Sequence, residues 1–126
     1  MKGLFITFEG IDGYVKTTQL NYFEKYLSEI GVNYVRTREP GGSNGAEEIR
    51  SLIVKGEISR WSPETETLLF FASRRDHMEK TIIPALEAGE VVICDRFTDS
   101  TRVYQGLARS EIVRKVDTLQ KIMIIL

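Results

Sequence analysis

The sequence predicts a three-layer α/β domain built on a parallel sheet. Short apolar runs of strand length alternate with longer segments in which apolar residues recur every three or four positions. The run at residues 4–8 is also continuous, as expected for a central parallel strand that is covered on both faces. A strand, a helix and a strand in that order form a right-handed crossover, which makes the strands parallel. The predicted strands are residues 4–8, 32–37, 91–94 and 122–126.

Composition excludes several classes of protein. The 126 residues suffice for a single domain, residues 1–126, and contain no internal repeat or linker. A formal net charge of −1 argues against a nucleic-acid surface, and no apolar run approaches the roughly 20 residues needed to cross a membrane. The chain runs directly into its first strand without a signal peptide pattern, so a cytoplasmic location is expected. Cys94, the single cysteine, is predicted to be a packed core residue.

The first half of the chain is predicted to contain two strands and two helices. After the first strand, apolar spacings from residue 16 to about residue 30 predict an amphipathic helix that Gly31 ends. The second strand leads into a loop at residues 38–43, where proline and glycine break regular structure. Residues 46–54 form the next predicted helix.

The second half begins with the longest helical pattern, residues 63 to about 89, which Pro84 is expected to kink or divide. His77, the single histidine, is assigned to an exposed face of this helix, without a partner for metal binding or nucleophilic catalysis. The third strand ends at Asp95 and Arg96, at the edge where open parallel sheets bind ligands. Two further helices are predicted at residues 98–107 and 111–119.

A candidate phosphate-binding loop joins the first strand to the first helix. In the pattern G-x-x-x-x-G-K-[ST], Gly10, Lys16 and Thr17 occupy three of the fixed positions. Backbone N–H groups of such a loop converge on an anion at the helix N-terminus. Lys16 is expected to bridge the β- and γ-phosphates of ATP, and the Thr17 hydroxyl to bind Mg²⁺. The predicted nucleotide-binding residues are Gly10, Ile11, Asp12, Gly13, Tyr14, Val15, Lys16, Thr17 and Thr18.

Val15 departs from the pattern because it occupies the position of the second glycine. A β-branched side chain adds bulk where the backbone should approach phosphate oxygens, and an unusual φ/ψ there would cost about 1–3 kcal/mol. The fit to a triphosphate is therefore expected to be impaired. The alternative interpretation is a glycine-rich turn that merely joins a strand to a helix.

Four motifs follow one another in an order and spacing that are specific in combination. The first two are Phe8-Glu9-Gly10-Ile11-Asp12-Gly13 with Lys16-Thr17-Thr18, and Arg38-Glu39-Pro40-Gly41-Gly42. The other two are Leu69-Phe70-Phe71-Ala72-Ser73-Arg74-Arg75, and Asp95-Arg96-Phe97-Thr98-Asp99-Ser100-Thr101 ending in Tyr104-Gln105-Gly106. Over about residues 3 to 109 the chain resembles the thymidylate (dTMP) kinases, in particular the bacterial branch. The resemblance implies a P-loop nucleoside-monophosphate-kinase-like fold and transfer of a phosphoryl group from ATP to dTMP, which gives dTDP and ADP.

The resemblance also implies roles for residues around the phosphates. Asp12 would accept a hydrogen bond from the deoxyribose 3′-OH, while Arg50 and Arg96 would hold the monophosphate, whose oxygens suit planar guanidinium forks. Asp95 would orient the Mg²⁺ shell, and Glu39 would order its loop and a metal-bound water. The residues expected to take part in catalysis are Lys16, Asp12 and Arg96.

The thymine pocket is implied in the same way. Phe70 would stack on the thymine ring, and Arg74 would donate to thymine O4, where cytosine presents a donor instead. Ser100, Thr101, Tyr104 and Gln105 would line the pocket. Taken singly, these residues also have structural interpretations, since Phe70 could belong to the core and Arg74 could be a solvated helix arginine.

The family pattern continues beyond this chain into a mobile lid, a fifth strand and closing helices, so an incomplete kinase domain truncated at the C-terminus is expected. Gly13 stands where other thymidylate kinases have an arginine, which places the catalytic arginine in the lid; such an arginine is worth ~10³–10⁵ in rate. The alternatives are a non-catalytic nucleotide-binding module, an inactive fragment, or another P-loop kinase such as a deoxynucleoside kinase. The resemblance further implies a homodimer and no nucleic-acid partner beyond mononucleotides.

Overall fold

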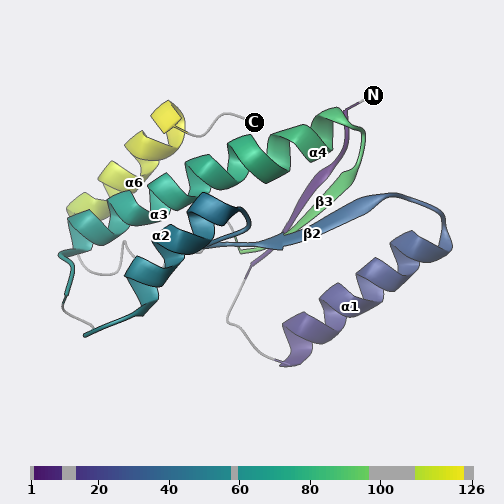
Figure 1. Ribbon diagram of the computed structural model, residues 1–126, viewed down its shortest axis with the longest axis horizontal. Helices are drawn as coiled ribbons and strands as arrows, with labels where there is room; N and C mark the ends of the chain where they lie inside the picture. Colours follow the sequence, from purple (N-terminus) through teal and green to yellow (C-terminus); the bar gives the residue numbers. More distant parts are fainter. Residues whose placement is uncertain (1, 10–13, 58–59, 97–109, 124–126) are drawn as a thin grey trace.

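The computed structural model describes residues 2–9, 14–57, 60–96 and 110–123. Its sheet has three parallel strands in the order β1-β3-β2. These are β1 (Phe5–Phe8), β2 (Tyr34–Arg38) and β3 (Val91–Asp95), with β3 in the centre (Figure 1). Strand β3 is the most continuously apolar of the three, because helices cover both faces of the sheet at its centre. The predicted parallel sheet is confirmed.

Helix α1 (Tyr14–Glu29) covers one face of the sheet. Leu20 and Leu27 are buried against Ile93 of β3, and they are seven residues apart, two turns along one helix face. Gly31, with a φ of 75°, follows the helix as the predicted stop. At the edge of this layer, Arg36 of β2 forms an ion pair with Glu24 of α1 over 2.8 Å.

The opposite face is covered by one continuous helical segment, which contains α3 (Pro63–His77), the π-helical turn η1 (Met78–Ile82) and α4 (Ile83–Glu87). The π-helical turn ends two residues before Pro84, which has no N–H and therefore cannot continue the α-helical ladder. The predicted division of the long helix therefore lies at the π-helical turn, just before Pro84. Phe71, Met78, Ile82 and Ala85 pack on Val92 and Cys94 of the sheet, and Cys94 is a core residue as predicted.

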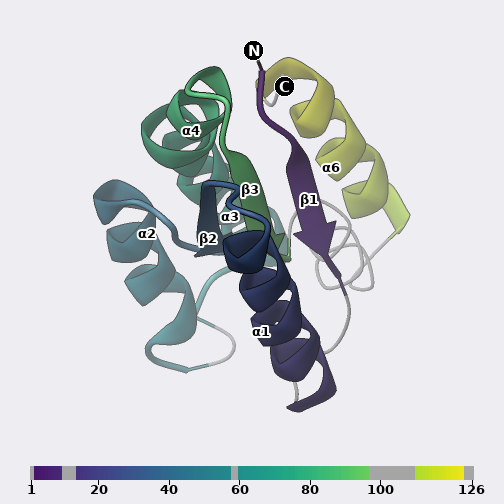
Figure 2. The same cartoon turned by 90° about the vertical axis from the view of Figure 1, so that its right-hand side faces the viewer.

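Two more helices pack on α3. Helix α2 (Asn44–Val54) begins after Ser43, whose side chain accepts a hydrogen bond from the Ala46 N–H. Helix α6 (Ser110–Met123) lies beside α3 on the far side from β2, and Figure 2 shows it next to β1. Within the described residues, no helix is both long and apolar enough to cross a membrane.

The prediction of a strand at residues 122–126 is wrong for its first two residues. Ile122 and Met123 belong to the last turn of α6, and Ile122 is 64% exposed. A short apolar run cannot be assigned to strand or helix by periodicity alone. Here the preceding helix, predicted at residues 111–119, continues through the run. Residues 124–126 and the helix predicted at 98–107 lie outside the described residues.

The unusual backbone conformation that would strain Val15 is not present. Val15 lies in the first turn of α1, and among the described residues Arg96 is the one non-glycine with a positive φ. The valine side chain is 69% exposed. Its departure from the loop pattern is therefore a matter of side-chain bulk at the start of the helix.

Candidate functional site

The carboxyl ends of the three strands meet at one edge of the sheet, where two backbone hydrogen bonds hold them together. The Glu39 N–H donates to the Asp95 carbonyl over 3.0 Å, and the Arg96 N–H donates to the Phe8 carbonyl over 2.9 Å. In open parallel sheets this edge is where ligands bind. Residues from the ends of β1, β2 and β3 are thus placed side by side at the predicted position.

Lys16 and Asp95 form an ion pair at this edge. Lys16 stands in the first turn of α1 and is 8% exposed, and its Nζ lies 2.6 Å from Asp95 Oδ1 at the end of β3. The predicted phosphate-binding lysine and the predicted metal-shell carboxylate are therefore in direct contact. Thr17, the other predicted Mg²⁺ residue, is the next residue of the helix and is exposed.

A hollow of about 720 Å³ opens beside this ion pair and is large enough for a nucleotide-sized ligand. Cationic and anionic side chains are both present in its wall. Its lining residues are Val35, Arg36, Thr37, Arg38, Gly42, Glu47, Thr81 and Asp95.

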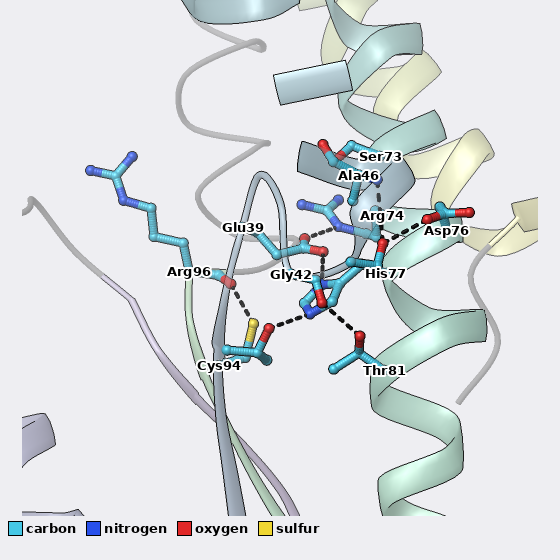
Figure 3. Close-up of polar contacts among 12 residues, drawn as sticks. Glu39, Gly42, Ala46, Ser73, Arg74, Asp76, His77, Thr81, Cys94 and Arg96 are labelled. Carbon is cyan, nitrogen blue, oxygen red and sulfur yellow. Dashed lines mark hydrogen bonds and ion pairs between the residues drawn. The ribbon is translucent and has the colours of Figure 1, made fainter. Parts of the chain in front are cut away.

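Behind the hollow, four polar side chains form a buried hydrogen-bonded chain between β2 and α3 (Figure 3). Arg74 Nε donates to Glu39 Oε1 over 2.5 Å, and His77 Nδ1 lies 2.7 Å from Glu39 Oε2. The other ring nitrogen of His77 lies 2.6 Å from Thr37 Oγ1. Glu39 is 7% exposed, Arg74 2% and His77 0%. The Arg74 guanidinium also lies over the Phe71 ring, 5.2 Å from its centroid.

Side chains from α3, η1 and α2 hold the loop that follows β2. Thr81 Oγ1 donates to the Gly42 carbonyl over 2.6 Å, and Ser43 Oγ donates to Asp76 over 2.6 Å. The Gly42 N–H donates to Glu47 Oε1 over 3.0 Å. This hydrogen bond, assisted by the Arg38 guanidinium, lowers the pKa of Glu47. The loop therefore has a defined shape at the mouth of the hollow.

Arg96 occupies a conformation that side chains other than glycine seldom adopt, with a φ of 70°. Its N–H is bound to β1, and its carbonyl accepts a hydrogen bond from the Cys94 thiol over 3.0 Å. Figure 3 shows its side chain directed away from the Glu39 and His77 cluster. Residues held in such conformations gather at binding and active sites.

A sequence profile described as Thymidylate kinase matches residues 8–123. The chain belongs to the thymidylate kinase family. A thymidylate kinase from Ruegeria pomeroyi is 61% identical over 122 residues, which are 97% of this chain and 58% of that protein. One from Dinoroseobacter shibae is 56% identical over 97% of this chain and 59% of its own length. The chain thus spans less than two thirds of the length of these relatives.

The solved structure of a thymidylate kinase from Ehrlichia chaffeensis matches the whole of this chain with a TM-score of 0.87 and 44% sequence identity. The match covers 71% of that chain. The fold class is therefore the one predicted, a three-layer P-loop kinase-like fold around a parallel sheet.

Several residues of the predicted thymidylate kinase site have a described place. Phe70 on α3 and Arg50 on α2 are half-buried, and Thr18 is half-buried on α1. The side chain of Tyr14 is not described. The other predicted site residues that lie outside the described residues are Gly10, Ile11, Asp12, Gly13, Ser100, Thr101, Tyr104 and Gln105.

The assignment of His77 to an exposed helix face is wrong. His77 follows Arg74 by three residues, so both project from the same side of α3 toward the sheet. A signal was present in β2 and the residue that follows it, where Val35, Thr37 and Glu39 alternate onto that face. Two polar residues that face inward require polar partners on the covering helix.

Proposed function

We propose that the chain binds dTMP and ATP with Mg²⁺ at the carboxyl edge of its sheet and that it takes part in phosphoryl transfer from ATP to dTMP, giving dTDP and ADP. The observation that supports this best is the contact of Lys16 with Asp95 beside a nucleotide-sized hollow. Membership of the thymidylate kinase family supplies the reaction class.

In this proposal Lys16 leaves Asp95 to bind the β- and γ-phosphates of ATP at the start of α1, where the helix dipole also favours negative charge. The donors fit Mg²⁺, since the Thr17 hydroxyl and the Asp95 carboxylate are hard oxygen ligands and Mg²⁺ keeps several of its waters. When bound, Mg²⁺ neutralises charge on the transferred phosphoryl group.

The acceptor side uses residues of the sheet edge and of α2 and α3. Arg96 and Arg50 hold the monophosphate, Phe70 stacks on the base and Arg74 donates to thymine O4. Glu39 orders its loop through its two hydrogen bonds. The remaining contacts are assigned to Asp12, Ser100, Thr101, Tyr104 and Gln105. Because little covalent chemistry falls to the protein, the rate depends on how these groups position the two nucleotides.

Titration calorimetry of the purified chain with dTMP, dCMP and ATP tests the binding part of the proposal. We expect dTMP to bind more tightly than dCMP, and Arg74→Ala to weaken dTMP by ~1.5–3 kcal/mol, the range for a hydrogen bond to a charged group. Equal binding of dTMP and dCMP would contradict the assignment of the base site. A coupled assay for ADP then tests phosphoryl transfer.

A dTMP-binding module without phosphoryl transfer is the second candidate. It is favoured by Val15, whose β-branched side chain stands one residue before Lys16 in the first turn of α1. This function requires tight dTMP binding together with weak ATP binding and no ADP formation. The same titrations and assay separate the two candidates.

We also infer a cytoplasmic location, where ATP and nucleoside monophosphates are available, and a homodimer formed by helices. The dimer is supported by exposed apolar side chains on α2 and α3, namely Leu52, Val54 and Leu68. Light scattering coupled to gel filtration should give twice the chain mass, and Leu68→Lys should shift it toward the monomer. A parent chain of monomer mass at all concentrations would contradict the dimer.

A further inference from the structure

We propose that His77 is a positioning residue for base recognition, because it holds Glu39 in the orientation that aims Arg74 at the nucleotide base. The proposal rests on the proposed dTMP function. It concerns a residue that was predicted on an exposed helix face and that is completely buried.

Glu39 receives one hydrogen bond on each carboxylate oxygen. Arg74 Nε donates to Oε1 and His77 Nδ1 to Oε2, over 2.5 and 2.7 Å. A carboxylate held by one donor can still turn about its terminal bond, whereas two donors fix its plane. The plane of Glu39 in turn sets the plane of the Arg74 guanidinium, because Nε lies next to the stem and shares that plane.

The His77 ring is itself held at both nitrogens, by a residue of β2 and by the residue that follows β2. Nδ1 meets Glu39, and Nε2 lies 2.6 Å from the hydroxyl of Thr37, two residues earlier on β2. The carboxylate acceptor assigns the proton to Nδ1, so that in the neutral ring Nε2 accepts from the Thr37 hydroxyl. The ring is thus a rigid link between Thr37 and Glu39.

Packing prevents the ring from turning away. Gly42, with a φ of 94°, passes so close that a Cβ on it would collide with the His77 ring, and would approach Thr37 Oγ1 to 2.5 Å. The whole chain of groups is also withdrawn from water, with Glu39, Arg74 and His77 all less than a tenth exposed. In such surroundings hydrogen bonds are stronger and an unsatisfied group is costly, so the arrangement has one favoured geometry.

Two substitutions test the roles of Nδ1 and Nε2 of His77 separately. The amide nitrogen of His77→Asn can replace Nδ1 and still donate to Glu39, whereas that of His77→Gln reaches the position of Nε2 and leaves Glu39 with one donor. By calorimetry, His77→Gln should reduce the preference for dTMP over dCMP by about tenfold, the scale of a hydrogen bond to a charged group. His77→Asn should retain most of that preference.

Ser73→Ala is the matched control, because it removes a buried hydrogen bond, from Ser73 Oγ to the Ala46 carbonyl over 3.2 Å, without touching Glu39 or the hollow. It should lower the melting temperature and leave the preference unchanged. If His77→Asn, His77→Gln and Ser73→Ala all reduced the preference in proportion to their loss of stability, His77 would be merely structural and the proposal would be overturned.

A second readout does not depend on dTMP. The Nε–H proton of Arg74, followed by NMR, should exchange with water at least tenfold faster in His77→Gln than in the parent and in His77→Asn. If the parent chain did not bind dTMP, the proposed function would fail while this measurement still decided the role of His77. Equal exchange in all three proteins would overturn the proposal.

Discussion

Lys16 Nζ lies 2.6 Å from Asp95 Oδ1, so the lysine at the start of α1 and the carboxylate at the end of β3 neutralise each other. Lys16 is 8% exposed. In the proposed function, a triphosphate at the start of α1 would have to compete with Asp95 for Lys16, and the released carboxylate would be available to hold Mg²⁺.

The first prediction concerns this competition. Without Mg²⁺, Asp95→Asn should bind ATP about three- to tenfold more tightly, a gain of roughly 0.7–1.4 kcal/mol, because it frees Lys16 and removes a negative charge. With Mg²⁺ the gain should vanish or reverse, because the amide is a poor metal ligand. Calorimetry with and without EDTA measures both. Glu87→Gln, which removes an exposed negative charge on α4, is the control. Weaker ATP binding of Asp95→Asn in both buffers would contradict the prediction.

The second prediction concerns Val15, which lies in helical backbone. Since no strain is released there, the gain in ATP affinity should come from removal of side-chain bulk alone. Val15→Ala and Val15→Gly should therefore improve ATP binding by a similar factor, while Val15→Gly lowers stability by up to about 1 kcal/mol relative to Val15→Ala. ATP titration and urea unfolding measure the two quantities. A gain confined to Val15→Gly would mean that the loop requires a backbone conformation that only glycine adopts.

The third prediction tests the close packing at Gly42. Gly42→Ala should cost clearly more than Gly31→Ala, although both glycines have a positive φ, of 94° and 75°. A Cβ at Gly31 meets nothing within 4 Å, so Gly31→Ala carries only backbone strain of about 1–2 kcal/mol. A Cβ at Gly42 also collides with the His77 ring. Equal losses of unfolding free energy for the two variants would show that the loop moves away from α3 at little cost.

The fourth prediction concerns Cys94. Burial raises the pKa of its thiol, so the native state keeps the proton that the unfolded state loses above its ordinary pKa of about 8.5. The stabilising contribution is complete below that pH and falls above it by about 1.4 kcal/mol per pH unit. Urea unfolding between pH 7 and pH 10 should therefore show a steeper loss for the parent chain than for Cys94→Ala. Parallel pH profiles would contradict the burial of the thiol.

Local patterns in the sequence were enough for the order and type of most elements. The continuous apolar run of β3, the three- and four-residue spacing of α1 and the stop at Gly31 are short-range features, because strand burial and helix faces are set by neighbouring residues. The motif Asp95-Arg96 was placed correctly at the carboxyl end of β3 for the same reason, since the apolar run that precedes it marks the strand.

Tertiary contacts decided what local patterns could not. Ile122 is as apolar as a strand residue, yet it continues α6, because a helix already formed extends more easily than a new strand pairs. His77 and Glu39 are 38 residues apart, and they meet because β2 and α3 pack face to face. A polar residue on a helix gains a buried partner only when another element brings one within hydrogen-bonding distance. The sequence by itself determined that this chain is an α/β domain whose strands end at one edge of a parallel sheet. The packing of α3 against the end of β2 decided that its single histidine is buried against Glu39.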